Sequence, residues 1–395
     1  MPINSKSVAA IAAAYGFGIA GFYAVVAHRT RHGMPDACSL RDDASVGRQR
    51  LPRVSIVLPA RNEERNVREC VSSLLDQDYP DYQVIVVDDA SEDATPAILQ
   101  EMAMSHPNRG RLALVHVASL PEGWAGKPHA LHTGATQATG DLLLFTDADT
   151  RHAPDTLSCA VGAALATEAD LLSLATHIDT PDFWSRVLMP FAFMGISMMY
   201  PAARVRDPKS RVAIANGQFI LIRRQAYDNV GGYAHPDLRA TVVDDRDLAA
   251  AVKRKGGHLV LVDGRKLVRV RMYQNFAEQW EGWGKNAYAG SRGGMLFYVL
   301  MIAGVPATGI LPFVLLGALP LARGRFVTPV AVAAVPSVAA SLVFRMKLNA
   351  ELGVPRRYIW THPLAAAVFT GILIRSAWRV RTGRGVIWRG RTFQV

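Results

Sequence analysis

The sequence predicts an α/β fold with a mostly parallel sheet, preceded and followed along the chain by membrane helices. From residue 54 onward, short β-branched runs alternate with helical patterns, as parallel strands joined by crossover helices do. Long uncharged apolar runs lie near both ends of the sequence, at 7–27 and again from 295. Two of the short apolar runs end abruptly in pairs of carboxylates, which is typical of a ligand site at the edge of such a sheet.

The composition favours contact with a membrane over contact with nucleic acid. Half of the residues are hydrophobic, and 44 Lys and Arg against 33 Asp and Glu give a net charge of +11. The basic residues do not alternate with aromatic residues on one module, which argues against nucleic-acid binding. They lie beside apolar runs, at 28–32, 323–325, 345–347 and 375–391. This placement suits anionic lipid head groups and the positive-inside rule for membrane proteins.

The three cysteines are Cys38, Cys70 and Cys159. Their spacing is too scattered for a zinc site or a disulfide framework. We therefore expect neither, and we expect a reducing, cytosolic setting for the main domain.

The first element is a membrane anchor. Residues 7–27 carry no charge and have the length that spans a bilayer, and the basic cluster at 28–32 follows them directly. A cleaved signal peptide is the alternative, but Lys6 alone is a weak positive region and the apolar stretch is long for a signal peptide. An uncleaved anchor at 1–30 is favoured, followed by a polar, irregular linker at 31–53.

Three strands and two helices open the main domain. The strands are predicted from short apolar or β-branched runs at 54–59, 83–87 and 111–117. Helices are predicted after the first strand and at 95–104. The second strand ends in Asp88 and Asp89. No Gly-x-Gly-x-x-Gly follows the first strand, so the usual dinucleotide-binding fingerprint is absent.

The stretch 141–150 is predicted to carry the chemistry. The apolar run from Leu142 to Phe145 has the pattern of a strand buried on both faces, and Asp147 and Asp149 follow it. Residues i and i+2 of an extended segment point the same way, so both carboxylates can face one point, where they suit Mg²⁺ or Mn²⁺. The alternative is an ordinary polar turn, and for this short motif alone that interpretation has at least equal weight.

The remaining elements lead back to the membrane. A strand is predicted at 171–177, and 182–200 is either a buried helix or an amphipathic helix in the membrane interface, with the interface favoured. Three apolar runs follow the main domain, at 295–321, 327–344 and 363–378. Arg375 interrupts the third run, and a third full span would put the basic tail outside. An interfacial or re-entrant third segment, or a hairpin in the first run, resolves this conflict.

These parts are those that a nucleotide-sugar transferase needs. A carboxylate at the end of the second strand can accept hydrogen bonds from a base or ribose. A cation held at Asp149 can neutralise the charge that builds on the departing diphosphate. A separate carboxylate must then take the proton from the acceptor as it attacks, and one direct displacement inverts the anomeric centre.

The chain resembles the family 2 glycosyltransferases of the GT-A fold, a Rossmann-like, mostly parallel sheet. The similarity covers roughly 54–285 and rests on several motifs in order, namely Val57-Leu58-Pro59-Ala60-Arg61-Asn62-Glu63-Glu64, Val86-Val87-Asp88-Asp89-Ala90-Ser91-Glu92-Asp93, Gly126-Lys127 with Ala130-Leu131, and Phe145-Thr146-Asp147-Ala148-Asp149.

The resemblance implies a role for each of these positions. It places Asp147 and Asp149 in a metal motif that takes Mg²⁺ or Mn²⁺. It assigns Asp245 as the catalytic base, with Asp244 second, although both acids also suit the first turn of a helix, where they favour the helix dipole. The nucleotide-sugar site is expected to comprise Pro59, Arg61, Glu63, Asp88, Asp89, Lys127 and Asp147.

One family motif departs from the pattern. The processive polysaccharide synthases of the family carry Gln-x-x-Arg-Trp after the base, and here Gln279 and Trp283 are kept while Gly282 replaces the arginine. This difference weakens a polysaccharide synthase interpretation. Gln279, Trp280 and Trp283 are expected on the acceptor side, although the two tryptophans are equally compatible with packing. The chain is most similar to the membrane-bound subgroup that acts on carotenoids and hopanoids.

The resulting expectation is an inverting, metal-dependent enzyme that moves a sugar from a nucleoside-diphosphate sugar to a lipid-soluble acceptor such as a carotenoid, a hopanoid or a related isoprenoid. The enzymatic alternative is a polyprenyl-phosphate glycosyltransferase or a polysaccharide synthase. The non-enzymatic alternative is a membrane assembly partner that binds the nucleotide sugar. We expect a cytoplasmic catalytic domain at 54–290 and a C-terminal region of two to three spans at 291–395, in the cell (plasma or inner) membrane.

Overall fold

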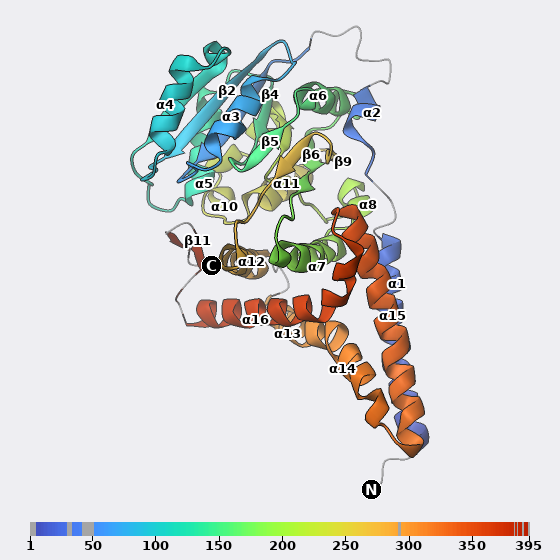
Figure 1. Ribbon diagram of the computed structural model, residues 1–395. Coiled ribbons are helices and arrows are strands. Elements are labelled where there is room, and N and C mark those ends of the chain that lie inside the picture. Colours follow the sequence, from blue (N-terminus) through green and yellow to red (C-terminus); the bar gives the residue numbers. More distant parts are fainter. Residues whose placement is uncertain are drawn as a thin grey trace. The chain divides into compact units, whose positions relative to one another are not determined.

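The computed structural model describes residues 5–29, 34–41, 51–290, 294–382, 384, 386–388 and 391–393 (Figure 1). Most of the predicted linker at 31–53 lies outside the described residues. The chain divides into two compact units. The catalytic unit comprises 33–179 and 202–272, and the terminal unit comprises 1–32, 180–201 and 273–395.

A seven-stranded sheet forms the centre of the catalytic unit, with the strand order β3-β2-β1-β4-β8-β6-β9. β8 runs antiparallel to both of its neighbours, and all other adjacent strands are parallel. The strands are β1 (Val54–Ala60), β2 (Tyr82–Asp89), β3 (Leu112–Val117), β4 (Leu142–Phe145), β6 (Leu171–Ala175), β8 (Ile220–Arg223) and β9 (Leu259–Asp263). The predicted α/β fold with a mostly parallel sheet is confirmed.

Helices cover this sheet because its strands are apolar on both faces. Every residue of β4 is buried, and Val54, Ile56 and Leu58 of β1 belong to the main core. Gly134 brings one helix very close to the sheet, since a Cβ there would lie 2.3 Å from Val57 Cγ1. The helices of this unit are α2 (Ala37–Arg41), α3 (Val67–Leu75), α4 (Thr95–Ser105), α5 (Gly126–Gln137), α6 (Thr156–Ala166), α8 (Ala202–Arg206), α9 (Arg224–Asn229), α10 (Pro236–Arg239) and α11 (Asp244–Arg254).

The chain leaves β1 and β2 in a strained conformation. Asn62 and Ala90, which follow these strands, have φ angles of 53° and 50°, in the left-handed region that few non-glycine residues adopt. The two loops are tied together, because Asn62 N donates to Ser91 Oγ at 3.0 Å and Glu92 N donates to Asn62 Oδ1 at 2.9 Å. Strain that is held in place by such bonds is found preferentially at functional sites.

A small second sheet, β5-β10-β7, lies beyond the end of β4. Its strands are β5 (Thr150–His152), β7 (His177–Ile178) and β10 (Val268–Val270). Strands of two or three residues show no measurable alternation of polar and apolar side chains, so the sequence did not predict this sheet. It fixes the direction in which the chain leaves the Asp147–Asp149 turn.

A disulfide joins Cys38 of α2 to Cys159 of α6. The expectation that the cysteines form no disulfide is therefore wrong. The two residues are 121 positions apart, so no local spacing pattern signalled the pair. The third cysteine, Cys70, is buried and free, and burial raises the pKa of its thiol to about 12. The cysteine pattern consequently no longer argues for a reducing compartment.

The described part of the terminal unit consists of helices and one short hairpin. It contains α1 (Ser5–Arg29), α7 (Phe183–Met199), α12 (Phe276–Gly290), α13 (Gly294–Gly309), α14 (Leu311–Ala318), α15 (Val327–Glu351), α16 (His362–Arg381) and a hairpin of β11 (Val386–Trp388) and β12 (Arg391–Phe393). Among the described residues, three segments are long and apolar enough to cross a membrane, Ser7–His28, Tyr298–Leu321 and Gly324–Glu351. Most of α16 coincides with the third predicted run, and it is not one of these three.

α1 and α15 pack closely because small residues lie between them. A Cβ at Gly16 would lie 2.2 Å from the carbonyl oxygen of Val332, so only glycine fits there. Ser337 Oγ donates to the Gly16 carbonyl at 3.3 Å. Small residues at a helix contact are the usual means by which membrane helices approach one another.

α7 contains Pro190, which has no N–H to donate to the carbonyl of Arg186 four residues earlier. The fully buried Arg345 of α15 supplies the missing hydrogen-bond donor. Its guanidinium donates to the carbonyls of Arg186 at 2.9 Å and Val187 at 2.8 Å. Asn349 Oδ1 accepts a further bond from Arg345 Nε at 2.9 Å. α7 is thus bonded to one of the candidate spans.

Candidate active site

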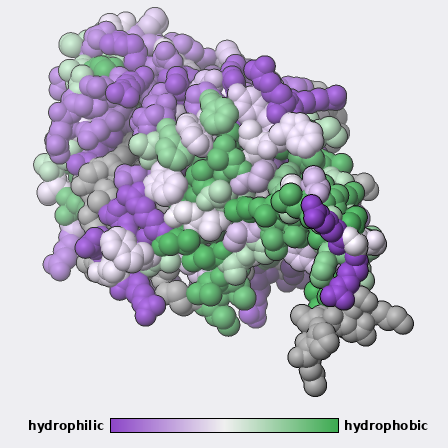
Figure 2. All heavy atoms as spheres, turned by 60° about the horizontal axis from the view of Figure 1, so that its bottom comes forward, coloured by the Kyte–Doolittle hydropathy of each residue, from purple (hydrophilic) through white to green (hydrophobic). Residues whose placement is uncertain are grey.

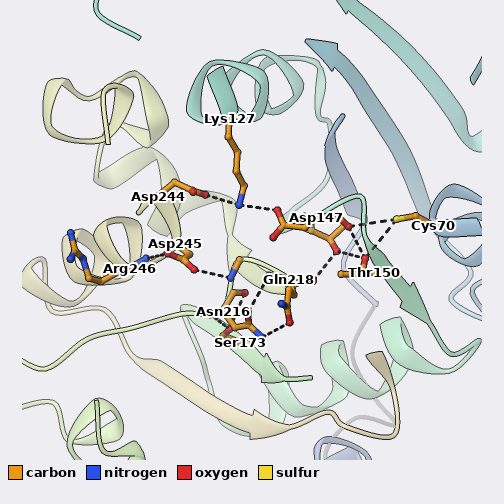
Figure 3. Close-up of polar contacts among 12 residues, drawn as sticks. Cys70, Lys127, Asp147, Thr150, Ser173, Asn216, Gln218, Asp244, Asp245 and Arg246 are labelled. Atoms are coloured by element: carbon orange, nitrogen blue, oxygen red, sulfur yellow. Dashed lines mark hydrogen bonds and ion pairs between the residues drawn. The ribbon is translucent and has the colours of Figure 1, made fainter. Parts of the chain in front are cut away.

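The candidate site lies in the catalytic unit at the end of β4, where three elements bring acids and a lysine together (Figure 3). Asp147 follows β4, Lys127 lies in the first turn of α5, and Asp244 and Asp245 begin α11. The predicted metal, phosphate-binding and base residues therefore come from elements that are far apart in the sequence. Asp149 lies two residues beyond Asp147 and is half-buried.

The ammonium group of Lys127 bridges two of these acids. Its Nζ lies 2.8 Å from Asp147 Oδ1 and 3.2 Å from Asp244 Oδ2. Burial alone lowers the pKa of Lys127, but the carboxylates of Asp147, Asp244 and Asp245 outweigh it and raise that pKa above its usual value. Lys127 is thus a permanently charged residue at the centre of an acidic cluster.

Asp245 is held by two backbone N–H groups. Gly217 N donates to its Oδ2 at 3.1 Å, and Arg246 N donates to its Oδ1 at 2.7 Å. Burial and the neighbouring carboxylate of Asp244 raise the pKa of Asp245 to about 6, against the opposing effect of Lys127. A carboxylate oriented in this way, with a pKa close to neutral pH, has the properties of a general base. The two acids do lie in the first turn of a helix, but they also reach Gly217 and Lys127.

Gly217 is a site residue to which the sequence analysis assigned no role. A Cβ at this position would lie 3.1 Å from Lys127 Nζ, 3.3 Å from Asp245 Oδ2 and 3.5 Å from Asp147 Oδ2. A Cβ there would be tight against Lys127 and Asp245 and in ordinary contact with Asp147.

A buried polar network supports the turn that carries Asp147. Thr150 Oγ1 donates to the Asp147 carbonyl at 2.7 Å, and Thr146 Oγ1 donates to the Gln218 carbonyl at 2.8 Å. His152 Nε2 lies 3.0 Å from the first hydroxyl and 3.2 Å from the second. Because both hydroxyl protons are already used, His152 Nε2 carries the hydrogen and donates. Burial lowers the pKa of His152 to about 3, so the ring stays neutral.

The residues expected at the nucleotide lie at the ends of β1 and β2. Asp88 and Asp89 are both buried, and Asp88 accepts bonds from Ser91 N at 3.2 Å and pairs with His116 Nδ1 at 2.9 Å. Arg61 NH1 donates to the Asp89 carbonyl at 2.7 Å. The buried Glu63 and half-buried Pro59 belong to the same two ends. The structure thus collects this predicted set at one edge of the sheet.

The comparisons with known proteins agree with this geometry. Residues 55–231 match the model of "Glycosyl transferase family 2". They form a family 2 glycosyltransferase domain. The matched segment contains β1, β2, β4 and β8 and therefore the sheet edge that carries Asp89, Lys127 and Asp147.

Relatives and a solved structure extend the similarity over most of the glycosyltransferase chain. Two proteins named 4,4'-diaponeurosporenoate glycosyltransferase, from Staphylococcus aureus strains MRSA252 and USA300, are 26% and 27% identical to it, and each alignment covers 87% of this chain and 88% of the relative. A mannosyltransferase from Pyrobaculum calidifontis, solved in complex with GDP-Man and Mn²⁺, aligns with a TM-score of 0.51. It is 20% identical, covering 95% of this chain and 98% of its own, and it shows that the fold is shared.

The departure of the glycosyltransferase from Gln-x-x-Arg-Trp has a steric explanation within the terminal unit. A Cβ at Gly282 would lie 2.4 Å from the ring of Tyr273, so no arginine fits there. In α12, Gln279 and Trp283 are buried and Trp280 is half-exposed. The amide atoms of Gln279 have no hydrogen-bond partner among the described residues. The acceptor-side role of these three residues stays a prediction.

Proposed function

We propose that this glycosyltransferase moves a sugar from a nucleoside-diphosphate sugar to a lipid-soluble acceptor, with inversion and with the help of a divalent cation. The observation that carries the proposal is the cluster of Lys127, Asp147, Asp244 and Asp245. It combines an oriented base with a positive charge and with carboxylates at the end of a strand. Transfer of a sugar from a charged donor to a hydroxyl acceptor uses the base for the acceptor proton, and it uses the positive charge and the carboxylates for the diphosphate and its cation.

The donor set at the end of β4 fits Mg²⁺ or Mn²⁺. Asp147 and Asp149 supply hard oxygen ligands, and the carboxylates of Asp147 and Asp244 already hold a cationic group within 3.2 Å. Asp149 and Asp147 are the residues that would hold the metal. A cation bound there supplies Lewis-acid stabilisation of the departing diphosphate.

The chain's own residues account for the remaining steps. Lys127 lies where it can neutralise phosphate oxygens. Asp89, Asp88 and Arg61 belong to the edge that would receive the nucleoside. Asp245 Oδ removes the proton of the acceptor hydroxyl, the acceptor oxygen bonds to the anomeric carbon, and the bond to the diphosphate breaks with its electron pair on the leaving oxygen. A carboxylate acceptor is already deprotonated, so its transfer needs no proton removal by Asp245.

The relatives support an isoprenoid acceptor. The Staphylococcus aureus relatives are named for 4,4'-diaponeurosporenoate, and each alignment covers 87% of this chain. We propose an acceptor of that class, a carotenoid, hopanoid or related lipid. Mass spectrometry of lipids from cells with and without the gene tests this directly. A new hexosylated isoprenoid supports the proposal, whereas unchanged lipids together with a changed polysaccharide or polyprenyl-phosphate sugar contradict it.

We further propose a multi-pass protein of the cell membrane with the catalytic unit in the cytoplasm. Three spans, at Ser7–His28, Tyr298–Leu321 and Gly324–Glu351, return the chain after residue 351 to the side that holds residues 34–290. α16 and the basic tail then lie on that side, as the positive-inside rule requires. This removes the conflict that a span at 363–378 creates. A C-terminal tag that is labelled only from outside intact cells would contradict this arrangement.

We expect the rate of transfer to a hydroxyl acceptor to fall as the pH drops through about 6. The pKa of Asp245 is raised to about 6, and the protonated carboxyl below that pH cannot accept a proton. A profile of kcat/KM from pH 5 to 8, with donor and metal saturating, measures it. A rate that stays constant down to pH 5 would count against Asp245 as the base.

We expect His152→Phe to weaken Mn²⁺ binding and donor binding by about 10- to 100-fold, the usual effect of losing a group that supports a metal ligand. The phenyl ring fills the same space but cannot donate to Thr150 and Thr146, so the Asp147 turn loses its support. His152→Gln keeps an N–H donor and is expected to recover much of the loss. Calorimetric titration of Mn²⁺ into each folded variant provides the measurement. Equal affinities for His152→Phe and wild type would refute the role.

A further inference from the structure

The catalytic unit carries a basic surface to which the proposed transfer reaction assigns no role. It consists of two stretches that are far apart in the sequence, residues 202–212 around α8 and residues 253–255 at the end of α11. We call these two stretches the basic surface. Only one acid, Asp207, belongs to them. Their basic residues are Arg204, Arg206, Lys209, Arg211, Lys253, Arg254 and Lys255.

Lys253 joins the two stretches. Its Nζ donates to the carbonyls of Arg204 at 3.1 Å, Val205 at 2.5 Å and Val212 at 2.8 Å. An ammonium group has three N–H donors, so all of them are used within the protein. The side chain of Val205 is fully buried and anchors α8 to the unit. The first stretch is therefore held in one conformation, and it needs little further ordering to bind a partner.

The other six basic side chains of this surface have no partner in the protein. All are exposed except Arg206, which is half-exposed. None of the six forms an ion pair or a side-chain hydrogen bond with a described residue. The carboxylate of Asp207 accepts the backbone N–H of Lys209 at 2.9 Å. Like charges that are held close together repel one another, and an external anionic partner relieves this repulsion.

The chemistry of the basic surface favours recognition by charge alone. Neither stretch contains an aromatic residue, so neither offers the stacking platform that accompanies basic residues in single-strand-binding proteins. None of their described residues is a strongly exposed large apolar one, so the surface has no side chain to insert into hydrocarbon. The expected partner is thus an extended surface of anionic groups.

The place of this surface in the chain favours lipid as that partner. Only Tyr200 and Pro201 separate α8 from α7, which belongs to the terminal unit and is bonded to the candidate span α15 through Arg345. α7 exposes Phe183 by 46% and Met199 by 38%. Figure 2 shows apolar side chains gathered on the face of the molecule that it brings forward. The basic surface therefore follows directly after a helix with the character of a membrane-interface segment.

We propose that the basic surface binds the anionic phospholipid head groups of the cytoplasmic leaflet. This binding holds the catalytic unit at the membrane by charge, in addition to the covalent link through α7. The attraction acts over about one Debye length, about 8 Å at physiological salt. The inference rests on the proposed membrane location, and it is independent of the acceptor and of the chemistry of sugar transfer.

The test uses the full-length protein in nanodiscs of phosphatidylcholine, with or without phosphatidylglycerol. A dye is attached to Ala203→Cys, an exposed position of α8, and energy transfer to a trace of head-group-labelled lipid measures the docked fraction. Cys38 and Cys159 are joined and Cys70 is buried, so the dye reacts at position 203. We expect energy transfer to rise with phosphatidylglycerol. This rise should disappear at about 1 M salt, where the Debye length is about 3 Å.

A variant of the basic surface tests which residues cause the rise. In the labelled protein, Arg204→Gln/Lys209→Gln/Arg211→Gln is expected to lower the ratio of docked to free protein by about tenfold or more, because three attractive charges are lost. The variant keeps Lys253 and the carbonyls to which it donates, so the fold of the stretch is retained.

The matched control removes three exposed positive charges elsewhere on the catalytic unit. It is Arg65→Gln/Arg109→Gln/Arg239→Gln, and we expect it to dock as the wild type does. An equal loss of docking in this control would show general attraction between charges and would overturn the assignment to the basic surface.

Two results with the wild-type sequence, labelled at position 203, would also overturn the proposal. One is energy transfer that is the same with and without phosphatidylglycerol. The other is loss of docking on addition of glycerol phosphate at a concentration equal to that of the lipid phosphate, which would indicate a soluble ligand. Insertion into pure phosphatidylcholine nanodiscs is measured separately. Failure to insert would contradict the membrane location itself and is thereby distinguished from failure of the basic surface to bind.

Discussion

Asp245→Asn is expected to lower kcat for transfer to a hydroxyl acceptor by about 10²- to 10⁴-fold, the contribution that a positioned general base makes. The amide keeps the size of the side chain, and its single oxygen can accept one of the two bonds from Gly217 N and Arg246 N, but its NH2 group cannot accept the other and the amide cannot take a proton. Donor binding is expected to stay close to wild type, because Asp245 acts on the acceptor. Steady-state kinetics with separate titration of donor and acceptor distinguishes these effects.

Asp247→Asn is the matched control for this variant. Asp247 lies in the same helical turn, and its carboxylate accepts from Thr241 Oγ1 at 2.5 Å and from Arg246 Nε at 2.9 Å, away from Lys127. The same change from carboxylate to amide there should leave kcat near the wild-type value. If both variants lose activity to the same extent, the loss is caused by a less stable α11 and not by the absence of the base.

Asp149→Ala is expected to lower kcat/KM by about 10²-fold or more at saturating metal. Lewis-acid stabilisation of a leaving group is worth several kcal/mol, and each 1.4 kcal/mol corresponds to about tenfold in rate. The binding of Mn²⁺, measured by calorimetry without acceptor, should weaken in parallel. Wild-type activity and unchanged Mn²⁺ affinity would remove Asp149 from the metal site.

Asp141→Ala is the control at the opposite end of the same strand. Asp141 accepts a bond from Arg53 N at 3.0 Å and is exposed. Its loss is expected to leave Mn²⁺ binding unchanged.

The variants Asp149→Ala and Asp245→Asn together also distinguish two kinds of acceptor. An inactive Asp149→Ala beside a nearly normal Asp245→Asn indicates an acceptor that needs no strong base, such as a polyprenyl phosphate or a carboxylate.

Features that depend on local sequence could be predicted. The parallel part of the sheet followed from buried runs alternating with helical patterns, and Asp89 and Asp147 were found because each ends such a run. Lys127 and Asp245 were identified only through the resemblance to a family. The reason is physical, because neither residue interrupts a periodic pattern that would mark it.

Features that arise from contacts between distant segments could not be predicted. Gly217 is confined by the side chains of Lys127, Asp147 and Asp245, which come from three other elements. His152 supports the Asp147 turn through two hydroxyls, and in the sequence it is one histidine among eleven. The antiparallel direction of β8 and the bond between Cys38 and Cys159 likewise depend on how the chain returns. None of these contacts has a counterpart in residue spacing.

The bond between Arg345 and the carbonyl of Arg186 has a consequence for the evolution of this chain. Pro190 leaves the Arg186 carbonyl without its helical N–H donor, and Arg345 donates to that carbonyl instead. A change at either position alone therefore leaves a buried polar group unpaired. Loss of the proline restores the helical N–H and makes the buried guanidinium superfluous. Relatives with another residue at 190 are therefore expected to lack arginine at 345. The two positions should be inherited as a pair.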